Sequence, residues 1–348
     1  MLRRSGMSAL RYGIPFLFLA MVPLGFAQGG AWSFLVVAAL PLCMVGFDRL
    51  LGHEPDTIAE ADGIIFRLLP WFIIPLQIAI TGWAAITIAH PGVTLVETIG
   101  LTLSVGLTAG IFGMLAAHEM VHSRKPSERA LGLAMLASVC YMQFRIAHIH
   151  GHHIHAATRK DSATARRGES AYRFVVRSVF GQLREAWTVE AARLRSRGRN
   201  VFGPANRMLQ YFAVEGLVVS GVAFLGPRAL GFFLVQSILA IALLELFNYI
   251  AHYGLLRRTL PAGGWERLGP SHSWNSSRRM NNWSLFNMGR HSDHHRFSAR
   301  AYQRLQPLPD VPELPTGYAG AILLALVPPL WRRVMDPRLD VWCGLWER

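Results

Sequence analysis

The sequence predicts an all-α, polytopic membrane protein with about six transmembrane helices and a cytoplasmic cap rich in histidine. Of the 348 residues, 52% are hydrophobic, and they fall in long runs with few charges. A run of about 20 apolar residues can cross a bilayer as a helix, because a helix satisfies its own backbone hydrogen bonds. We expect one integral membrane domain over residues 1–348. Its predicted spans are 12–27, 31–47, 68–90, 95–117, 209–227 and 229–250.

The predicted spans differ in length and in charge. Residues 68–90 and 95–117 are nearly free of charge, and the last two spans follow the same pattern, with one acid each, Glu215 and Glu245. The spans 12–27 and 31–47 are shorter, and together they suggest a hairpin of two helices. Basic residues before the first run would also suit a secretory signal, but five more apolar runs favour a retained span.

Positive charge is concentrated between and after the spans. The net charge is +14, and Lys and Arg gather at the N-terminus, between 118 and 207, and beyond 252, whereas the 90–94 connection has none. If 118–206 and 251–348 are cytoplasmic, this distribution satisfies the positive-inside rule and predicts a multi-pass protein of the bacterial inner membrane. No nucleic-acid-binding motif accompanies the charge, so we expect no nucleic-acid partner.

The three cysteines make a thiolate site improbable. Cys43, Cys140 and Cys343 are odd in number and form no CxxC pair. This pattern argues against a disulfide framework, an iron–sulfur cluster and a thiolate zinc site.

Histidines form four clusters on the predicted cytoplasmic side. In the first, His118 and His122 flank Glu119 in an HExxH pattern, which on a helix places both imidazoles on one face. The second has five histidines within 148–155, and on a helix His148 and His152 would share a face. Two other histidines, His53 and His90, stand alone, and we treat them as structural.

The remaining clusters lie at the end of the last span and in the tail. His252 follows Glu245, Asn248 and Tyr249 at helical spacings, which predicts one inward polar stripe. His291, His294 and His295 surround an aspartate that could orient a ligand, with His272 upstream. Four clusters exceed the needs of one tetrahedral zinc, so they predict two metals. Imidazole ligands without cysteine suit iron, copper or zinc.

The order and spacing of these boxes resemble a known family. HEMVH, HIHGHH, NYIAHYGL and HSDHH are similar to the boxes of the membrane-bound alkane hydroxylases. These are non-haem diiron monooxygenases related to xylene monooxygenase and, more distantly, to membrane fatty-acid desaturases. The resemblance covers roughly residues 60–340. The segments SHSWNS, LFNMGRHSDHH and LPTGYAGAILLALVPPLWRRVMDP resemble the alkane hydroxylase branch rather than the desaturases.

The resemblance implies an activity and its reactants. It implies terminal hydroxylation of an n-alkane to a 1-alkanol by two non-haem iron ions and O2, on an apolar substrate from the lipid phase. Electrons would come from NAD(P)H through a reductase and a rubredoxin or ferredoxin carrier, and an arginine-rich face would suit an acidic carrier.

The resemblance also implies the site residues. The supporting residues would be Asp161, Glu245, Asn248, His272 and Asp293, whereas His150 and His155 fall off the pattern. The nine implied ligands are His118, His122, His148, His152, His153, His252, His291, His294 and His295.

This chain departs from the family pattern at two carboxylates. The family usually has Glu before the histidine of its second and third boxes, and here Ala147 and Ala251 stand there. The segment 156–170 also lacks the usual prolines. We therefore expect a divergent subgroup.

Three other functions fit part of the pattern. A membrane fatty-acid or lipid desaturase or hydroxylase would use the same metal site but give a different product. An intramembrane zinc protease would need one zinc and Glu119 as general base. A non-catalytic metal-binding or transport protein would bind metal without consuming oxygen.

Overall fold

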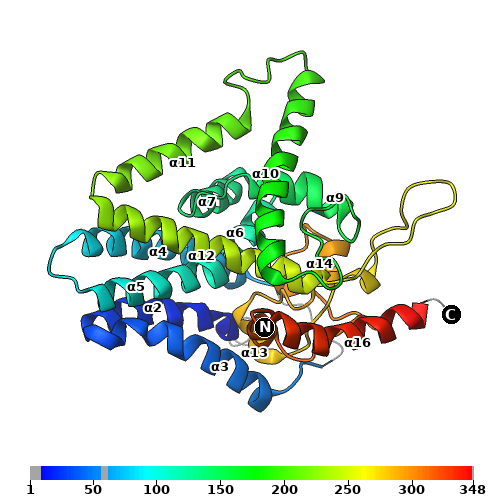
Figure 1. The fold of residues 1–348 in the computed structure, drawn as a ribbon, viewed down its shortest axis with the longest axis horizontal. Coiled ribbons are helices and arrows are strands. Elements are labelled where there is room, and N and C mark those ends of the chain that lie inside the picture. The colour runs from blue at the N-terminus through cyan, green and yellow to red at the C-terminus, as the bar shows by residue number, and fades with distance from the viewer. Residues whose placement is uncertain (1–8, 56–61, 347–348) are drawn as a thin grey trace.

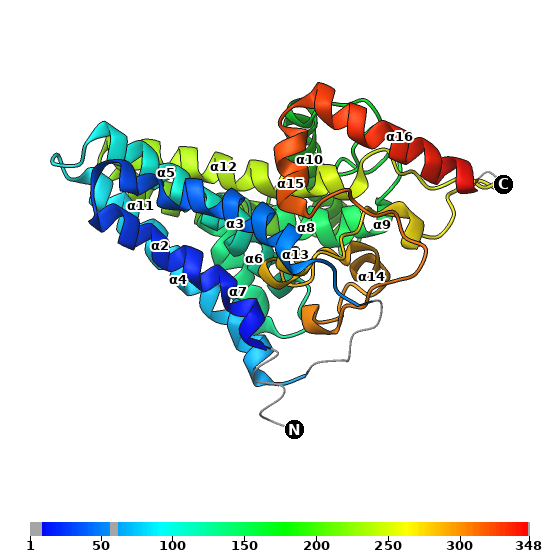
Figure 2. The same ribbon diagram turned by 90° about the horizontal axis from the view of Figure 1, so that it is seen from below.

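The computed structural model describes residues 9–55 and 62–346, and in this part of the chain all regular structure is helical, with isolated β-bridges and no strand. Long apolar helices run side by side, and shorter helices form a cap at one end (Figures 1 and 2). The all-α prediction is therefore confirmed. The α-helices are α2 Ile14–Ala27, α3 Leu35–Leu51, α4 Ile64–Ala89, α5 Leu95–Thr108, α6 Met114–Val121, α7 Pro126–Ala137, α8 Phe144–Ala147, α9 His153–His155, α10 Ala171–Arg195, α11 Arg207–Ala223, α12 Pro227–His252, α13 Arg279–Ser284, α14 His291–Arg296, α15 Tyr318–Ala325 and α16 Pro328–Trp346.

Within residues 9–55 and 62–346, four helical segments are long and apolar enough to cross a membrane: Gly30–Leu51, Ile64–Ala89, Leu95–Val121 and Pro227–His252. The first predicted span corresponds to a shorter apolar helix, Arg11–Ala27. The fifth corresponds to α11, which has 17 residues and is inclined to α12 (Figure 1). The multi-pass architecture is thus supported, but the count of six is not.

The two ends of the bundle differ in chemistry. At one end, the 90–94 connection joins α4 to α5, and Glu97 ties it to the first hairpin by accepting from the Gly30 and Thr94 amides, both at 2.9 Å. Arg228 at the start of α12 donates to the carbonyls of His90 and Val93. At the other end, α6, α12 and α14 meet the cap, and the histidine boxes lie there.

Two stretches of the cap take a form that their local sequence pattern does not show. The apolar stretch 130–146 is not one helix, because α7 ends at Ala137 and the chain turns through Cys140, whose φ of 54° is left-handed, before α8. The arginine-rich stretch that begins at 180 belongs to the longer α10, which ends at Arg195. The apolar stretch 317–331 forms α15 and the start of α16.

Two short π-helical segments interrupt the helices that lead to the histidines. One, Ala109–Gly113, joins α5 to α6, and the other, His148–His152, joins α8 to α9. Gly110 in the first allows close packing, because a side chain there would come within 2.9 Å of Ala240 Cα on α12. π-Bulges are frequent at functional sites, because they change which residues share a helix face.

Candidate metal centre

Nine buried or half-buried histidines form two groups at the cap end of the bundle. Within each group, one ring nitrogen of every histidine lies within 4.8 Å of the others. All nine implied ligands are therefore brought together. The five-histidine group contains His118, His122, His148, His153 and His294, and the four-histidine group contains His152, His252, His291 and His295.

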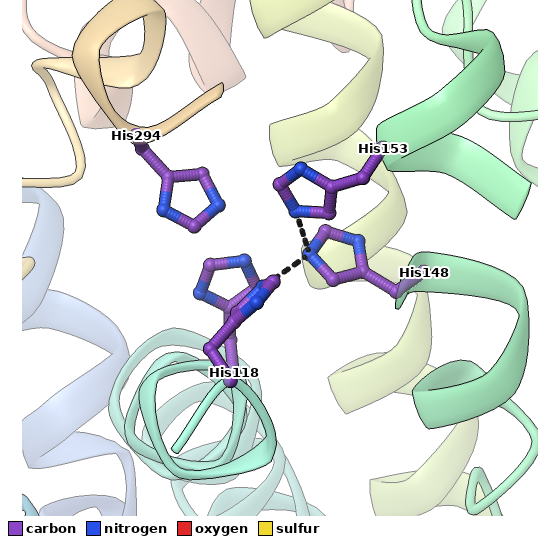
Figure 3. Close-up of side chains that lie close together, drawn as sticks. His118, His148, His153 and His294 are labelled. Atoms are coloured by element: carbon purple, nitrogen blue, oxygen red, sulfur yellow. Dashed lines mark hydrogen bonds between the residues drawn. The ribbon is translucent and has the colours of Figure 1, made fainter. Parts of the chain in front are cut away.

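The five-histidine group draws on three parts of the chain. Figure 3 shows His118, His148, His153 and His294 arriving from different elements with their rings around a common space. Nε2 of His148 lies 3.0 Å from Nε2 of both His122 and His153. Phe144, one turn earlier, stacks on the His148 ring with centroids 4.7 Å apart. The rings of this group are thus held by one another and by aromatic packing.

The four-histidine group has a tighter core. The Nε2 atoms of His252, His291 and His295 form a triangle with sides of 3.1, 3.2 and 3.0 Å. His152 joins them, with its ring centroid 4.9 Å from those of His252 and His295. Three segments that are distant in sequence therefore contribute to this group.

The π-helical segment decides how the second box is shared. We expected His148 and His152 to share a face, and this was wrong: they belong to different groups. His148 is instead paired with His153, five residues later, because a π-turn brings i and i+5 together. The last box is divided as well. His294 joins the five-histidine group, whereas His291 and His295, at i and i+4, join the other.

The convergence of these nitrogens fits metal ions. A neutral imidazole offers one N–H and one lone pair, so three Nε2 atoms that face one another cannot all be satisfied by shared protons. His152 Nε2 and His294 Nε2 are also buried without a hydrogen-bond partner in the described chain. Unpaired buried nitrogens are costly. Lone pairs directed at a common cation would remove that cost in both groups.

Two of the five predicted supporting residues contact histidines of the four-histidine group. Asp161 lies 2.9 Å from Nδ1 of His152, and the backbone carbonyl of His272 lies 3.2 Å from Nδ1 of His252. An acceptor at Nδ1 fixes the tautomer that leaves Nε2 free for a metal. Burial lowers the pKa of His152, but the carboxylates of Asp161, Glu185 and Glu245 together raise it above its ordinary value.

The other three predicted supporting residues contact groups other than the histidine rings. Asn248 donates to Glu245 at 3.5 Å, and Glu245 contacts side chains of α10 and the 138–143 turn rather than a histidine. Asp293 was expected to orient a ligand. It instead accepts two bonds from Arg300 and one from the Gln306 amide. Its role in the described chain is thus to tie the last histidine box to the following loop.

Comparison with known proteins agrees with this geometry. The family model "Fatty acid desaturase" matches residues 94–322. Two alkane 1-monooxygenases of Pseudomonas aeruginosa are 37% and 39% identical to this chain, covering 91% and 90% of it and 86% and 84% of their own length. The chain belongs to this family. The hydroxylase component of a xylene/toluene monooxygenase from Pseudomonas putida is 29% identical, over 97% of the chain and 90% of its own length.

Membership of the alkane monooxygenase family makes this chain a membrane oxidoreductase and agrees with a site for two metal ions. It also bears on the zinc protease alternative. The Glu119 carboxylate, which a protease would use as general base, accepts from the Tyr302 amide at 3.1 Å through one of its oxygens.

The histidines outside the family pattern have ordinary surroundings. His155 packs edge-on against Trp265, and His150 is half-exposed. His53 forms an isolated bridge with Arg278, and His90 ends α4. None of the four is a member of either histidine group among the described residues.

Sequence reasoning missed Glu185, on α10. Its carboxyl group packs against Gly151 of the second box so closely that a side chain at Gly151 would lie 2.3 Å from Glu185 Cδ. The available signal was Gly151 itself, because a glycine among bulky histidines suggests that another group approaches the backbone closely. Nothing in the sequence indicated which residue fills it.

An apolar cavity adjoins the metal centre. One part, of about 580 Å³, is lined by α3, α5, α10, α12 and α15. A second apolar hollow shares Leu40, Ile111, Leu243 and Ile322 with it and extends to Phe247, whose ring centroid is 5.5 Å from that of His291. Tyr172 and Val176, both more than half exposed, line its outer part. Two neighbouring apolar hollows therefore lie between the bundle surface and Phe247, which packs against His291 of the four-histidine group.

Proposed function

We propose that this protein uses O2 and two iron ions to hydroxylate the terminal carbon of an n-alkane, giving a 1-alkanol. The observation that carries the proposal is the pairing of two convergent histidine groups with an apolar cavity that ends beside one of them. The nine histidines would be the ligands. The two ions, when bound, would supply reductive activation of O2 and insertion of one oxygen into an unactivated C–H bond.

The closest nitrogen contacts in the two groups suit ligand angles near 90° better than tetrahedral angles. At metal–nitrogen distances of about 2.1 Å, tetrahedral zinc would separate its ligand nitrogens by about 3.4 Å, whereas angles near 90° separate them by about 3.0 Å. The contacts in both groups are 3.0–3.2 Å. The five and the four histidines would hold one ion each, and imidazole ligands without cysteine are compatible with iron.

The protein's own contribution would be to orient ligands and substrate and to exclude water. Asp161 and His272 would fix the ring orientations of His152 and His252. The apolar cavity would hold an alkyl chain along the bundle and direct its end towards the Phe247–His291 contact. A dry, apolar lining also prevents water from competing at the reacting carbon.

Electrons would arrive from an acidic carrier of the rubredoxin or ferredoxin type, reduced by an NAD(P)H-dependent reductase. The surface around Ile154 suits docking, because Ile154 is 56% exposed and directly follows the ligand His153. Arg159 and Lys160 are exposed nearby, and Lys160 lies over Trp265. An apolar centre with a basic edge would attract an acidic redox protein and shorten the electron path.

The proposed location is the bacterial inner membrane, with the histidine end in the cytoplasm. Exposed arginines of the cap, such as Arg159, Arg166 and Arg195, support this orientation. A cytoplasmic cap would meet a soluble electron carrier, while the cavity opens towards lipid.

Metal analysis of the purified full chain, followed by product analysis, tests the proposal. We expect about two irons per chain and, with a supplied electron chain, a 1-alkanol whose oxygen derives from O2. A single zinc with no oxygen consumption would overturn it. An alkene or a modified fatty acid as the product would instead favour the desaturase alternative, which the matched family model makes the second candidate.

A further inference from the structure

Two acidic side chains lie behind the four-histidine group without a cationic partner. Glu245 of α12 is fully buried, and its oxygens accept from Tyr141 Oη at 2.9 Å, Ser178 Oγ at 2.5 Å and Gln182 Nε2 at 2.9 Å. All of these donors are neutral, and no Lys or Arg of the described chain forms an ion pair with Glu245 or Glu185. Burial disfavours the charge of this carboxylate, and the convergent donors oppose that effect.

Glu185 of α10 is the second of these groups. Its carboxyl group lies against the backbone of the π-helical segment at Gly151, between the ligands His148 and His152. Its Oε2 is buried and has no hydrogen-bond partner in the described chain. Burial raises the pKa of Glu185 to about 7, and Asp161 adds to the effect, whereas His152 opposes it. A buried charge of this kind is costly unless a cation is near.

The adjacent positions in the histidine boxes carry no charge. Ala147 and Ala251 directly precede His148 and His252, and both are fully buried. Two divalent ions held only by neutral imidazoles would bring four positive charges into a buried site, and such a site needs nearby anions. Asp293 is already paired with Arg300. Glu185 packs against Gly151, the residue before His152, and Glu245 lies two helical turns before His252 on α12.

We propose that Glu185 and Glu245 are positioning residues that supply the negative charge behind His152 and so stabilise the metal ions in their more oxidised state. The inference rests on the proposed function, because it requires two metal ions in the histidine groups. Glu245 acts from the membrane side through α12, and Glu185 acts from the cap side through α10. Glu185 packs against the π-helical segment at Gly151, whereas Glu245 is held by Tyr141 and by donors on α10, and the two charges would together offset the charge of the ions.

Glu185→Gln and Glu245→Gln test this inference in the full chain. The matched control is Glu215→Gln, because Glu215 is also a buried acid of a long apolar helix but contacts the Met142 amide. The probes are Co²⁺, titrated optically, and the reduction potential of the iron-loaded protein. The unaltered chain should bind two Co²⁺ ions. In each test variant, we expect the affinity for the more weakly bound of the two to fall about 10-fold to 100-fold.

The potential separates an electrostatic role from a purely structural one. Removing a negative charge favours the reduced ions. The reduction potential should therefore rise by about 59 mV for every tenfold change in the ratio of the affinities for the reduced and the oxidised ion. Glu215→Gln should leave both readouts unchanged. Glu185→Asp should restore most of the loss, since it keeps the charge.

Three outcomes would overturn the inference or its basis. Unchanged Co²⁺ affinity and potential in Glu185→Gln would overturn it, even if Glu245→Gln fails to fold. An equal change in the Glu215→Gln control would also overturn it, because the effect would then be general. Failure of the unaltered chain to bind two Co²⁺ ions would overturn the proposed metal centre itself, and the two failures are thereby distinguished.

Discussion

The two histidine groups use different means to hold their rings. In the four-histidine group, Asp161 and the His272 carbonyl contact the second nitrogens of His152 and His252. In the five-histidine group, no carboxylate of the described chain hydrogen-bonds an imidazole, and the rings pack against one another and Phe144. The four-histidine group is thus supported by hydrogen bonds, and the five-histidine group by packing among its larger number of rings.

This difference suggests a division of tasks between the groups. Hydrogen bonds to the second nitrogen make an imidazole a more basic and better oriented ligand. A group of five rings can lose one and still offer four donors. The four-histidine group is also the one that the apolar cavity approaches through Phe247. We therefore expect its metal to be the more sensitive to substitution, and the following experiments test that expectation.

Removal of a ligand should have the largest effect. His295→Ala leaves three histidines in its group and should reduce the metal content to about one ion per chain. His294→Ala leaves four and should lower the metal content less. Both should abolish hydroxylation. Elemental analysis and product assays of each variant, with His53→Ala as an unaffected control, would check this. Equal loss of metal in the two variants would contradict the expected difference between the two histidine groups.

Loss of the carboxylate behind His152 should have the next largest effect. Asp161→Asn removes the charged acceptor at His152 Nδ1 and should weaken metal binding about 10-fold to 100-fold. Asp293→Asn is the matched control, because Asp293 contacts Arg300 and the Gln306 amide instead of a histidine. Competition with a metal chelator would measure both affinities. A larger effect at Asp293 would contradict the assigned roles.

Narrowing the cavity should alter substrate choice without changing the metal. Ile322 lines both parts of the cavity, so Ile322→Trp should shorten the longest accepted alkane and lower its kcat/KM about tenfold, or about 1.4 kcal/mol. The metal content should remain that of the unaltered protein. Leu217→Trp, on the exposed face of α11, serves as the control. An unchanged chain-length profile would exclude the cavity as the substrate path.

Charge reversal at the docking surface should have the smallest effect. Arg159→Glu with Lys160→Glu should slow reduction by an acidic carrier about tenfold at low salt and less at high salt. Reduction by a small chemical reductant should be unchanged. Arg195→Glu with Arg197→Glu, at the far end of α10, is the control pair. Stopped-flow reduction rates would separate the two surfaces, and a rate insensitive to ionic strength would count against an acidic carrier.

Much of the candidate site was accessible from the sequence. The four boxes identified every histidine that the structure brings into the two groups, because ligand residues of one type at helical spacings leave a strong local pattern. The long apolar runs likewise predicted α4, the α5–α6 segment and α12. Arg11–Ala27 and α11 were harder to assign, since short or weakly apolar helices at a bundle edge differ little from spans in composition.

Residue order and helical period alone determined which side chains of this chain meet at one end of a helical bundle. Only the tertiary structure decided how they are shared, because a π-turn moves His153 to the face of His148 and sends His152 to the other group. It also decided that Asp293 pairs with Arg300, and that Glu185 and Glu245 lie behind the histidines. Those contacts join residues far apart in sequence, and packing between helices sets them rather than any local pattern.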